Sequence, residues 1–269
     1  MVEDHLISKE ENFIVSCCNF YENALLHLLF GTSLHPGGLQ LTKELGEKLN
    51  LCPKDKVLDL ASGLGTSAMF LAKEFGVSII GIDVSEKNVR DANSLAQRRG
   101  LGDRVKFMVA NAEKLPFEDQ SFDVIISECS FCLFQNKESA SLEMNRLLNS
   151  GGRLGITDVA IEKKLPIDIE KMIFKVACIS DALSMNGYRQ VLERGGFVIS
   201  ILEDRKNLVN KLIADIKKKI FFAEIAKGLN KIELRGLDLE QAKYWLKRAK
   251  ELIDEGYGTY CLIIGFKPG

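Results

Sequence analysis

Two acidic residues and two glycines have the types and spacing to bind a nucleotide. Asp59 lies at the end of an apolar run, Gly63 and Gly65 follow it, and residues 66–75 are expected to form a helix. Glycine has no Cβ atom to keep a ligand away from the backbone, and the first N–H groups of a helix lack partners within it. The stretch therefore predicts a strand, a turn and a helix that together cradle a nucleotide cofactor.

Two classes of cofactor fit this cradle. Residues 63–68 satisfy the dinucleotide pattern G-x-G-x-x-G/A, and Asp83 lies 20 residues beyond Gly63. Asp59 discriminates between the classes, because its charge would repel a pyrophosphate but attract the ammonium group of S-adenosylmethionine. Asp83, at the end of a strand expected over residues 77–82, could accept the ribose hydroxyls of either cofactor. The sequence therefore favours S-adenosylmethionine.

Five motifs occur in the order typical of one enzyme family. A D-x-x-x-G-x-G turn begins at Asp59, and an acidic strand end follows at Asp83. Residues 111–117 match D-A-E-x-L-P-F with asparagine first, and an F-D-x-V strand begins at Phe122. Residues 148–152 match the L-x-P-G-G turn expected before strand five, with serine for proline. Over residues 38–159 the chain resembles the class I S-adenosylmethionine-dependent methyltransferases.

The resemblance implies an α/β fold and a set of cofactor residues. The fold is a Rossmann-like seven-stranded methyltransferase sheet with N-terminal helices and, in this chain, a helical insertion between strands six and seven. Ala61 replaces the usual first glycine, a change expected to be harmless, and Asn111 replaces an aspartate but can still accept a hydrogen bond from adenine. The implied cofactor residues are Asp59, Ala61, Gly63, Gly65, Thr66, Asp83, Val84, Asn88, Asn111, Ala112, Glu113 and Glu128.

The chain divides into four expected parts. Residues 1–50 form a helical segment that covers the cofactor, and residues 51–204 form the cofactor-binding core. Residues 205–257 form the insertion, because apolar residues recur there at helical spacing from Leu208 to Ile220. Residues 258–269 supply the final strand. The insertion is expected to cap the substrate side of the core or to form an oligomer contact.

Cysteines near the expected methyl position suggest one class of acceptor. Cys129 and Cys132 are three residues apart after the fourth strand, and two thiolates could hold a soft electrophile such as a trivalent metalloid. Residues 127–129 and 178–183 resemble segments of arsenite methyltransferases, and this resemblance implies Cys129 and Cys178 as ligands. Free cysteines are equally often simple packing residues.

An organic acceptor remains an alternative. Methylation of an oxygen or nitrogen benefits from a base, and His35 and Glu128 are the nearest candidates. His35 could equally order its own glycine-rich loop. A non-catalytic cofactor-binding protein of the same fold is a third hypothesis, although intact Asp59 and Asp83 argue against it.

Composition excludes several partners. A net charge of −1 gives no general attraction to nucleic acid, and Lys217, Lys218 and Lys219 lie in a helical pattern as a solvated face. The sequence has no apolar run of membrane-spanning length and no basic, apolar leader, so a cytoplasmic enzyme of small molecules is expected. Seven cysteines, an odd number, predict free thiols, and no resident metal is expected.

Overall fold

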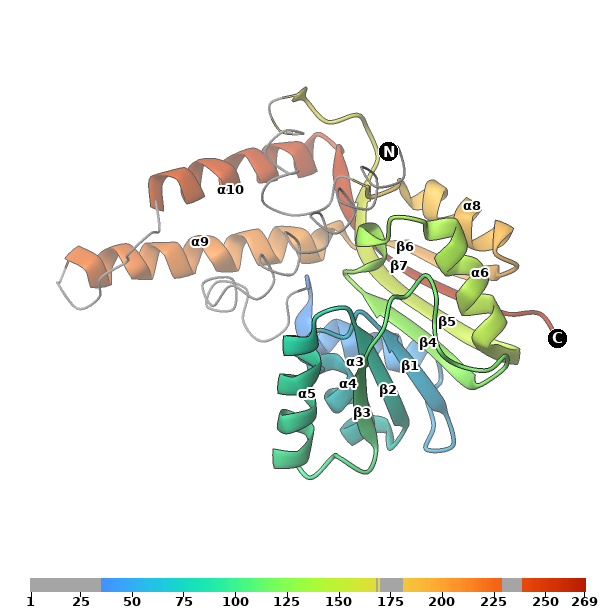
Figure 1. The fold of residues 1–269 in the computed structure, drawn as a ribbon. Coiled ribbons are helices and arrows are strands. Elements are labelled where there is room, and N and C mark those ends of the chain that lie inside the picture. The colour runs from blue at the N-terminus through green and yellow to red at the C-terminus, as the bar shows by residue number, and fades with distance from the viewer. Residues whose placement is uncertain (1–34, 168, 170–180, 229–238) are drawn as a thin grey trace, which may run out of the picture.

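A seven-stranded mixed sheet forms the centre of the computed structural model, which describes residues 35–167, 169, 181–228 and 239–269 (Figure 1). The strand order is β3-β2-β1-β4-β5-β7-β6, and only β7 runs antiparallel to its neighbours. The strands are β1 Lys56–Leu60, β2 Ser78–Asp83, β3 Val105–Val109, β4 Phe122–Glu128, β5 Leu148–Ile161, β6 Val198–Asp204 and β7 Gly258–Phe266. The predicted Rossmann-like sheet is confirmed.

Helices cover both faces of the sheet because each face is apolar. The first face is covered by α3 Gly38–Lys48, α4 Thr66–Phe75 and α5 Glu86–Arg98, which bury residues such as Leu45, Met69 and Ala92 against it. On the other face, α6 Lys137–Leu147 and α8 Met185–Arg194 bury Met144 and Leu192, and the short helix η1 Phe131–Leu133 lies beside them. The predicted helix over 66–75 coincides with α4.

The predicted helical insertion between strands six and seven is also confirmed. It consists of α9 Lys206–Gly228 and α10 Leu239–Asp254, which lie side by side and extend beyond the sheet (Figure 1). The two helices bury Ile216, Ile220 and Leu239 between them. None of the helices among the described residues is long and apolar enough to cross a membrane.

One predicted boundary is wrong. Residues 148–152 were expected to form a turn before the fifth strand, but β5 already begins at Leu148, which pairs with Phe122 of β4. The register between the two strands then shifts, and Gly151 adopts a left-handed φ of 73°. The motif is therefore an irregularity inside the strand, because a glycine at positive φ bends the chain without ending its pairing.

Candidate active site

Three carboxylates meet at the carboxyl edge of the sheet. Asp59, Asp83 and Glu128 come from β1, β2 and β4, which are adjacent parallel strands. Burial, and then the charges of Glu128 and Asp83, raise the pKa of Asp59 well above its usual value. A cation beside Asp59 would relieve both effects, because it would replace lost solvation and offset the like charges. The surroundings of Asp59 therefore fit the ammonium group of S-adenosylmethionine.

Asp83 is held in one orientation by backbone donors. Gly63 N donates to Oδ2 at 2.8 Å, and Ser85 N donates to Oδ1 at 2.9 Å. Asn88 lies close by, with its Nδ2 atom 3.5 Å from Oδ1, and its backbone N–H donates to the N-cap Ser85. Val84 is exposed although apolar. Val84 therefore gives an apolar surface next to the fixed Asp83 carboxylate, and a ring could stack on this surface.

The two glycines of the turn have different roles. A Cβ atom on Gly63 would meet nothing within 4 Å, as expected for a residue that a ligand approaches. A Cβ atom on Gly65 would lie 2.1 Å from Cζ of Phe107, a buried residue of β3. The Phe107 ring therefore gives Gly65 a packing reason to lack a side chain, and its contact with a cofactor stays a prediction. Thr66, predicted to contact the cofactor, begins α4 directly after it.

Ala61 adopts a conformation that glycine would tolerate better. Its φ is 54°, in the left-handed region that costs an L-residue roughly 1–2 kcal/mol. The expectation that alanine is harmless here was therefore wrong for the backbone, although its small side chain still fits. Ser62 N donates to Ile82 O at 2.8 Å, which ties this strained turn to β2.

The segment at residues 111–117 lies beside Asp83 along the same edge. Ala110 N donates to Asp83 O at 3.1 Å, and Ala112 is buried. Asn111 is exposed, and its Oδ1 accepts from Glu113 N at 2.9 Å. Glu113 accepts from Asn136 N at 3.0 Å, so its carboxylate caps a turn before α6. The structure thus gives Glu113 a structural contact that the sequence did not suggest.

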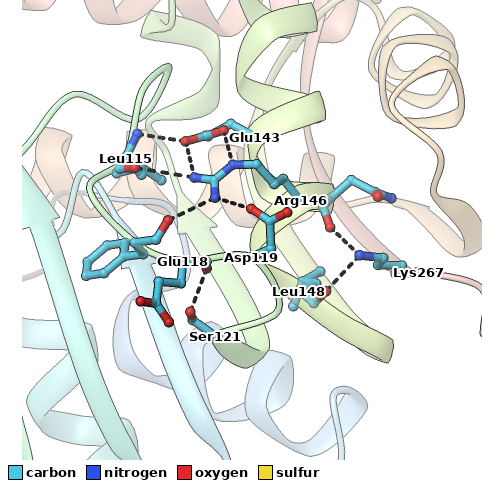
Figure 2. Close-up of polar contacts among 10 residues, drawn as sticks. Leu115, Glu118, Asp119, Ser121, Glu143, Arg146, Leu148 and Lys267 are labelled. Carbon is cyan, nitrogen blue, oxygen red and sulfur yellow. Dashed lines mark hydrogen bonds and ion pairs between the residues drawn. The ribbon is translucent and has the colours of Figure 1, made fainter.

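A single arginine of α6 anchors this segment (Figure 2). Arg146 donates through Nε and Nη2 to the two carboxylate oxygens of Glu143, at 2.8 and 2.7 Å. It also donates to Phe117 O at 2.9 Å and to Asp119 Oδ1 at 2.6 Å, while Leu115 N donates to Glu143 Oε1. Hydrogen bonds from Arg146 lower the pKa of Glu143, so the pair stays charged. Sequence reasoning missed both residues because they lie outside every motif.

Two polar side chains, Thr42 and His35, lie beside the Glu128 carboxylate. Thr42 Oγ1 of α3 donates to the Glu128 carboxylate, with its oxygens at 3.2 and 3.1 Å, and lies 3.4 Å from His35 Nε2. His35 Nε2 is itself 3.8 Å from Glu128 Oε2, and both side chains are buried. The two predicted base candidates are therefore neighbours. Thr42 was missed, because a threonine in an N-terminal helix carries no distinguishing pattern.

The cysteines have surroundings that favour the protonated thiol. Burial, and then the charge of Asp158, raise the pKa of both Cys129 and Cys132. Cys132 is fully buried, whereas Cys129 is partly buried and adopts a φ of 54°. These pKa directions are the opposite of what a pair of thiolate ligands needs. Cys178 lies outside the described residues, among which no His, Cys, Asp and Glu cluster could hold a metal ion.

Comparisons with known proteins agree with this geometry. A family model for a methyltransferase domain matches residues 52–196. Methyltransferase GfsG of Streptomyces halstedii is 31% identical over 200 residues, which are 68% of this chain and 72% of that protein. 27-O-demethylrifamycin SV methyltransferase of Amycolatopsis mediterranei is 29% identical over 259 residues, which are 91% of this chain and 93% of that protein.

The fold also matches a structure determined with the cofactor. Phosphoethanolamine N-methyltransferase 2 of Haemonchus contortus, solved in complex with S-adenosyl-L-methionine, superposes with a TM-score of 0.79 at 18% identity. The match covers 90% of this chain and 56% of that one. With the family match and the acidic, glycine-containing edge of the sheet, the chain belongs to the S-adenosylmethionine-dependent methyltransferases of class I.

Proposed function

We propose that this enzyme methylates an oxygen or nitrogen atom of a small organic molecule and that Glu128 and His35 accept the proton. The contact between Thr42 and Glu128 is the observation that carries the proposal, because it fixes a carboxylate at the end of β4. β1 and β4 pair so that Asp59 lies opposite Ile126, two residues before Glu128, and the charge of Glu128 raises the pKa of Asp59, the group that we assign to the cofactor ammonium. This arrangement suits a base in reach of an acceptor.

The cofactor residues follow from the same edge of the sheet. Asp59 would pair with the ammonium and Asp83 would accept the ribose hydroxyls, while Gly63 and the start of α4 at Thr66 let the ligand approach the backbone. Val84, Asn111 and Ala112 would contact adenine. Asn88 and Glu113 would act indirectly, through Asp83 and the turn before α6.

In the reaction, the bound cofactor supplies a methyl group on a sulfonium whose bonding electrons stay with sulfur when the acceptor attacks. Glu128 would take the acceptor proton as the new bond forms to the methyl carbon. His35, 3.8 Å from Glu128 Oε2, would share or pass on that proton. Thr42 would keep the carboxylate oriented. The buried setting of these side chains strengthens their hydrogen bonds.

The names of the relatives support an organic acceptor. The rifamycin relative acts at an oxygen and the Haemonchus protein at a nitrogen, according to those names. Neither name refers to a metalloid, and the protonated state favoured at Cys132 argues against a metalloid bound between two thiolates.

A soft acceptor held by Cys129 is a second candidate function. One observation favours it: Cys129 adopts a left-handed φ directly after Glu128, and such strain in a residue other than glycine is concentrated at functional sites. The raised pKa of Cys129 counts against it.

A turnover assay with labelled cofactor and a panel of phenols, alcohols, amines, thiols and arsenite tests both candidates. The main proposal predicts turnover of an oxygen or nitrogen acceptor, a loss of at least about a hundredfold in Glu128→Gln, and little change in Cys129→Ser. Turnover confined to arsenite or thiols and lost in Cys129→Ser would establish the second candidate instead. Cofactor affinity of each variant, measured by calorimetry, separates loss of chemistry from loss of binding.

A further inference from the structure

The outer face of α9 combines exposed aromatic residues with a run of lysines. Phe221, Phe222 and Ile225 are 58%, 66% and 45% exposed, and the rings of the two phenylalanines are 6.0 Å apart. Lys217 and Lys218 are exposed one turn earlier in the helix. Residues separated by three or four positions lie on the same face of a helix, so these five side chains form one continuous surface. We call these five residues the basic-aromatic face.

This face is separate from the surface by which α9 packs. Ile213, Ile216 and Ile220 are buried, and Ile216 and Ile220 contact α10. At 100° per residue, the buried isoleucines are centred about 140° around the helix from the centre of the basic-aromatic face. Among the described residues, the hairpin of α9 and α10 also extends away from the sheet (Figure 1). The apolar side chains on the face are therefore not explained by the core of the hairpin.

Charge indicates the kind of partner. α9 carries six lysines and two acidic residues, in a chain whose net charge is −1. A helix that presents lysines beside phenylalanine and isoleucine suits the boundary of an anionic membrane, where the rings enter the acyl region and the lysine stems reach up to the headgroups. Lipid headgroups supply the negative charge and the chains supply the apolar environment, so one partner satisfies both features.

The size of the face argues against a second copy as the occupant. A stable dimer buries about 800 Å² on each partner, whereas three side chains of roughly 200 Å² each, partly buried already, offer much less. We propose that the basic-aromatic face docks the enzyme reversibly on anionic lipid surfaces. The absence of a spanning helix among the described residues is compatible with this, because a peripheral helix lies in the interface without crossing it.

Vesicle flotation of the full chain tests the proposal. Binding is expected to vesicles of phosphatidylcholine mixed with phosphatidylglycerol, and not to phosphatidylcholine alone. Phe221→Ser with Phe222→Ser, and separately Lys217→Glu with Lys218→Glu, should each reduce binding by about tenfold or more. Leu142→Ser is the matched apolar control, since Leu142 of α6 is 59% exposed, and Lys54→Glu with Lys73→Glu is the matched charge control. Both controls should bind as the wild type does.

Several outcomes would overturn the proposal. In the first, the wild-type protein fails to float with anionic vesicles, and in the second, it binds neutral vesicles equally well. In the third, the control variants lose as much binding as the test variants do. A concentration-dependent dimer that Phe221→Ser with Phe222→Ser converts to a monomer, without vesicle binding, would assign the face to a second copy. Cofactor affinity and thermal unfolding of each variant verify folding. Because the lysines are exposed, Lys217→Glu with Lys218→Glu keeps the test decisive if the phenylalanine variant fails to fold.

Discussion

Thr42 and Glu128 are 86 residues apart in the chain, yet the Thr42 hydroxyl lies within 3.2 Å of both carboxylate oxygens of Glu128. Thr42 is fully buried in α3, and Glu128 ends β4. The hydroxyl has one hydrogen, so it donates to the carboxylate and can accept from His35. This contact connects the helix before the core to the edge of the sheet where chemistry is proposed.

Replacing Thr42 by valine removes this donor at nearly constant volume. We expect kcat to fall by about tenfold to a hundredfold, the scale of a lost hydrogen bond to a charged group, while cofactor affinity stays within about twofold. Thr42→Ser keeps the hydroxyl and should retain most of the activity. Steady-state kinetics and calorimetry measure the two effects, and equal losses in the valine and serine variants would mean that packing, not the hydroxyl, matters at this position.

Asp83→Ala should weaken binding of S-adenosylmethionine by about 1.5–3 kcal/mol, because a charge-assisted acceptor is lost. The variant also leaves Gly63 N and Ser85 N without the carboxylate that accepts from both. Some loss of thermal stability should therefore accompany the loss of affinity. Calorimetric titration checks the affinity, and an unchanged dissociation constant would rule out the placement of the ribose.

Ala61 and Gly63 form a natural matched pair, since both have a φ of 54°. Ala61→Gly should stabilise the enzyme by up to about 1 kcal/mol, because relief of left-handed strain exceeds the added flexibility of the unfolded chain. Gly63→Ala should destabilise it by about 1 kcal/mol, since its Cβ would meet open space and only the backbone is strained. Urea denaturation measures both changes, and shifts of the same sign would contradict the argument.

Arg146→Gln should cost about 2 kcal/mol of stability, because Glu143 and two backbone carbonyls lose a charged donor. The pKa of Glu143 is lowered in the folded state, so this stabilisation exists above its unfolded pKa and is lost as the pH falls. Arg194→Gln is the control, because the pair of Arg194 and Glu138 is exposed and should contribute less than about 1 kcal/mol. Equal losses of stability in the two variants would mean that Arg146 contributes no more than an exposed ion pair.

Asp158 should give a dependence of stability on pH that is opposite to that of Glu143. Burial raises its pKa to about 6, although Cys132 and Val159 donate backbone N–H groups to it and Lys137 lies near. A raised pKa means that stability is full below the unfolded value of 3.8 and is lost as the pH rises through about 6, by about 3 kcal/mol. In Asp158→Asn this slope should disappear. Denaturation midpoints measured across that pH range test this prediction. An unchanged slope in the variant would mean that other groups cause the loss of stability.

The parts of the enzyme that follow local rules could be predicted from the sequence. Helix α4 has the predicted bounds, since it follows the glycine turn directly and ends at Gly76. Asp59 and Asp83 were placed at one edge because neighbouring parallel strands end on the same side of a sheet. Contacts that depend on tertiary packing could not be predicted in this way. The neighbour of Glu128 is set by how α3 docks, and the partner of Gly65 is a phenylalanine on β3.

Cysteine presented a different difficulty. The sequence cannot distinguish a thiolate ligand from a small buried apolar residue, because both uses place cysteine in apolar surroundings. In the structure, burial distinguishes the two uses, because Cys132 is fully enclosed as a buried apolar residue would be. The phenylalanines of α9 were overlooked for a related reason: the helical pattern from Leu208 to Ile220 accounted for the buried side and said nothing of apolar residues opposite it.

The order of the last strands also has an evolutionary consequence. The chain leaves the sheet at Asp204, the last residue of β6, which pairs with Cys261 of the returning strand β7. Arg205 N donates to Tyr260 O at 2.6 Å. The two ends of the insertion are thus fastened next to each other on adjacent strands. Lengthening a connection whose ends are already joined adds little closure entropy. The hairpin can therefore vary in length during evolution with little disturbance of the sheet that carries the cofactor-binding edge.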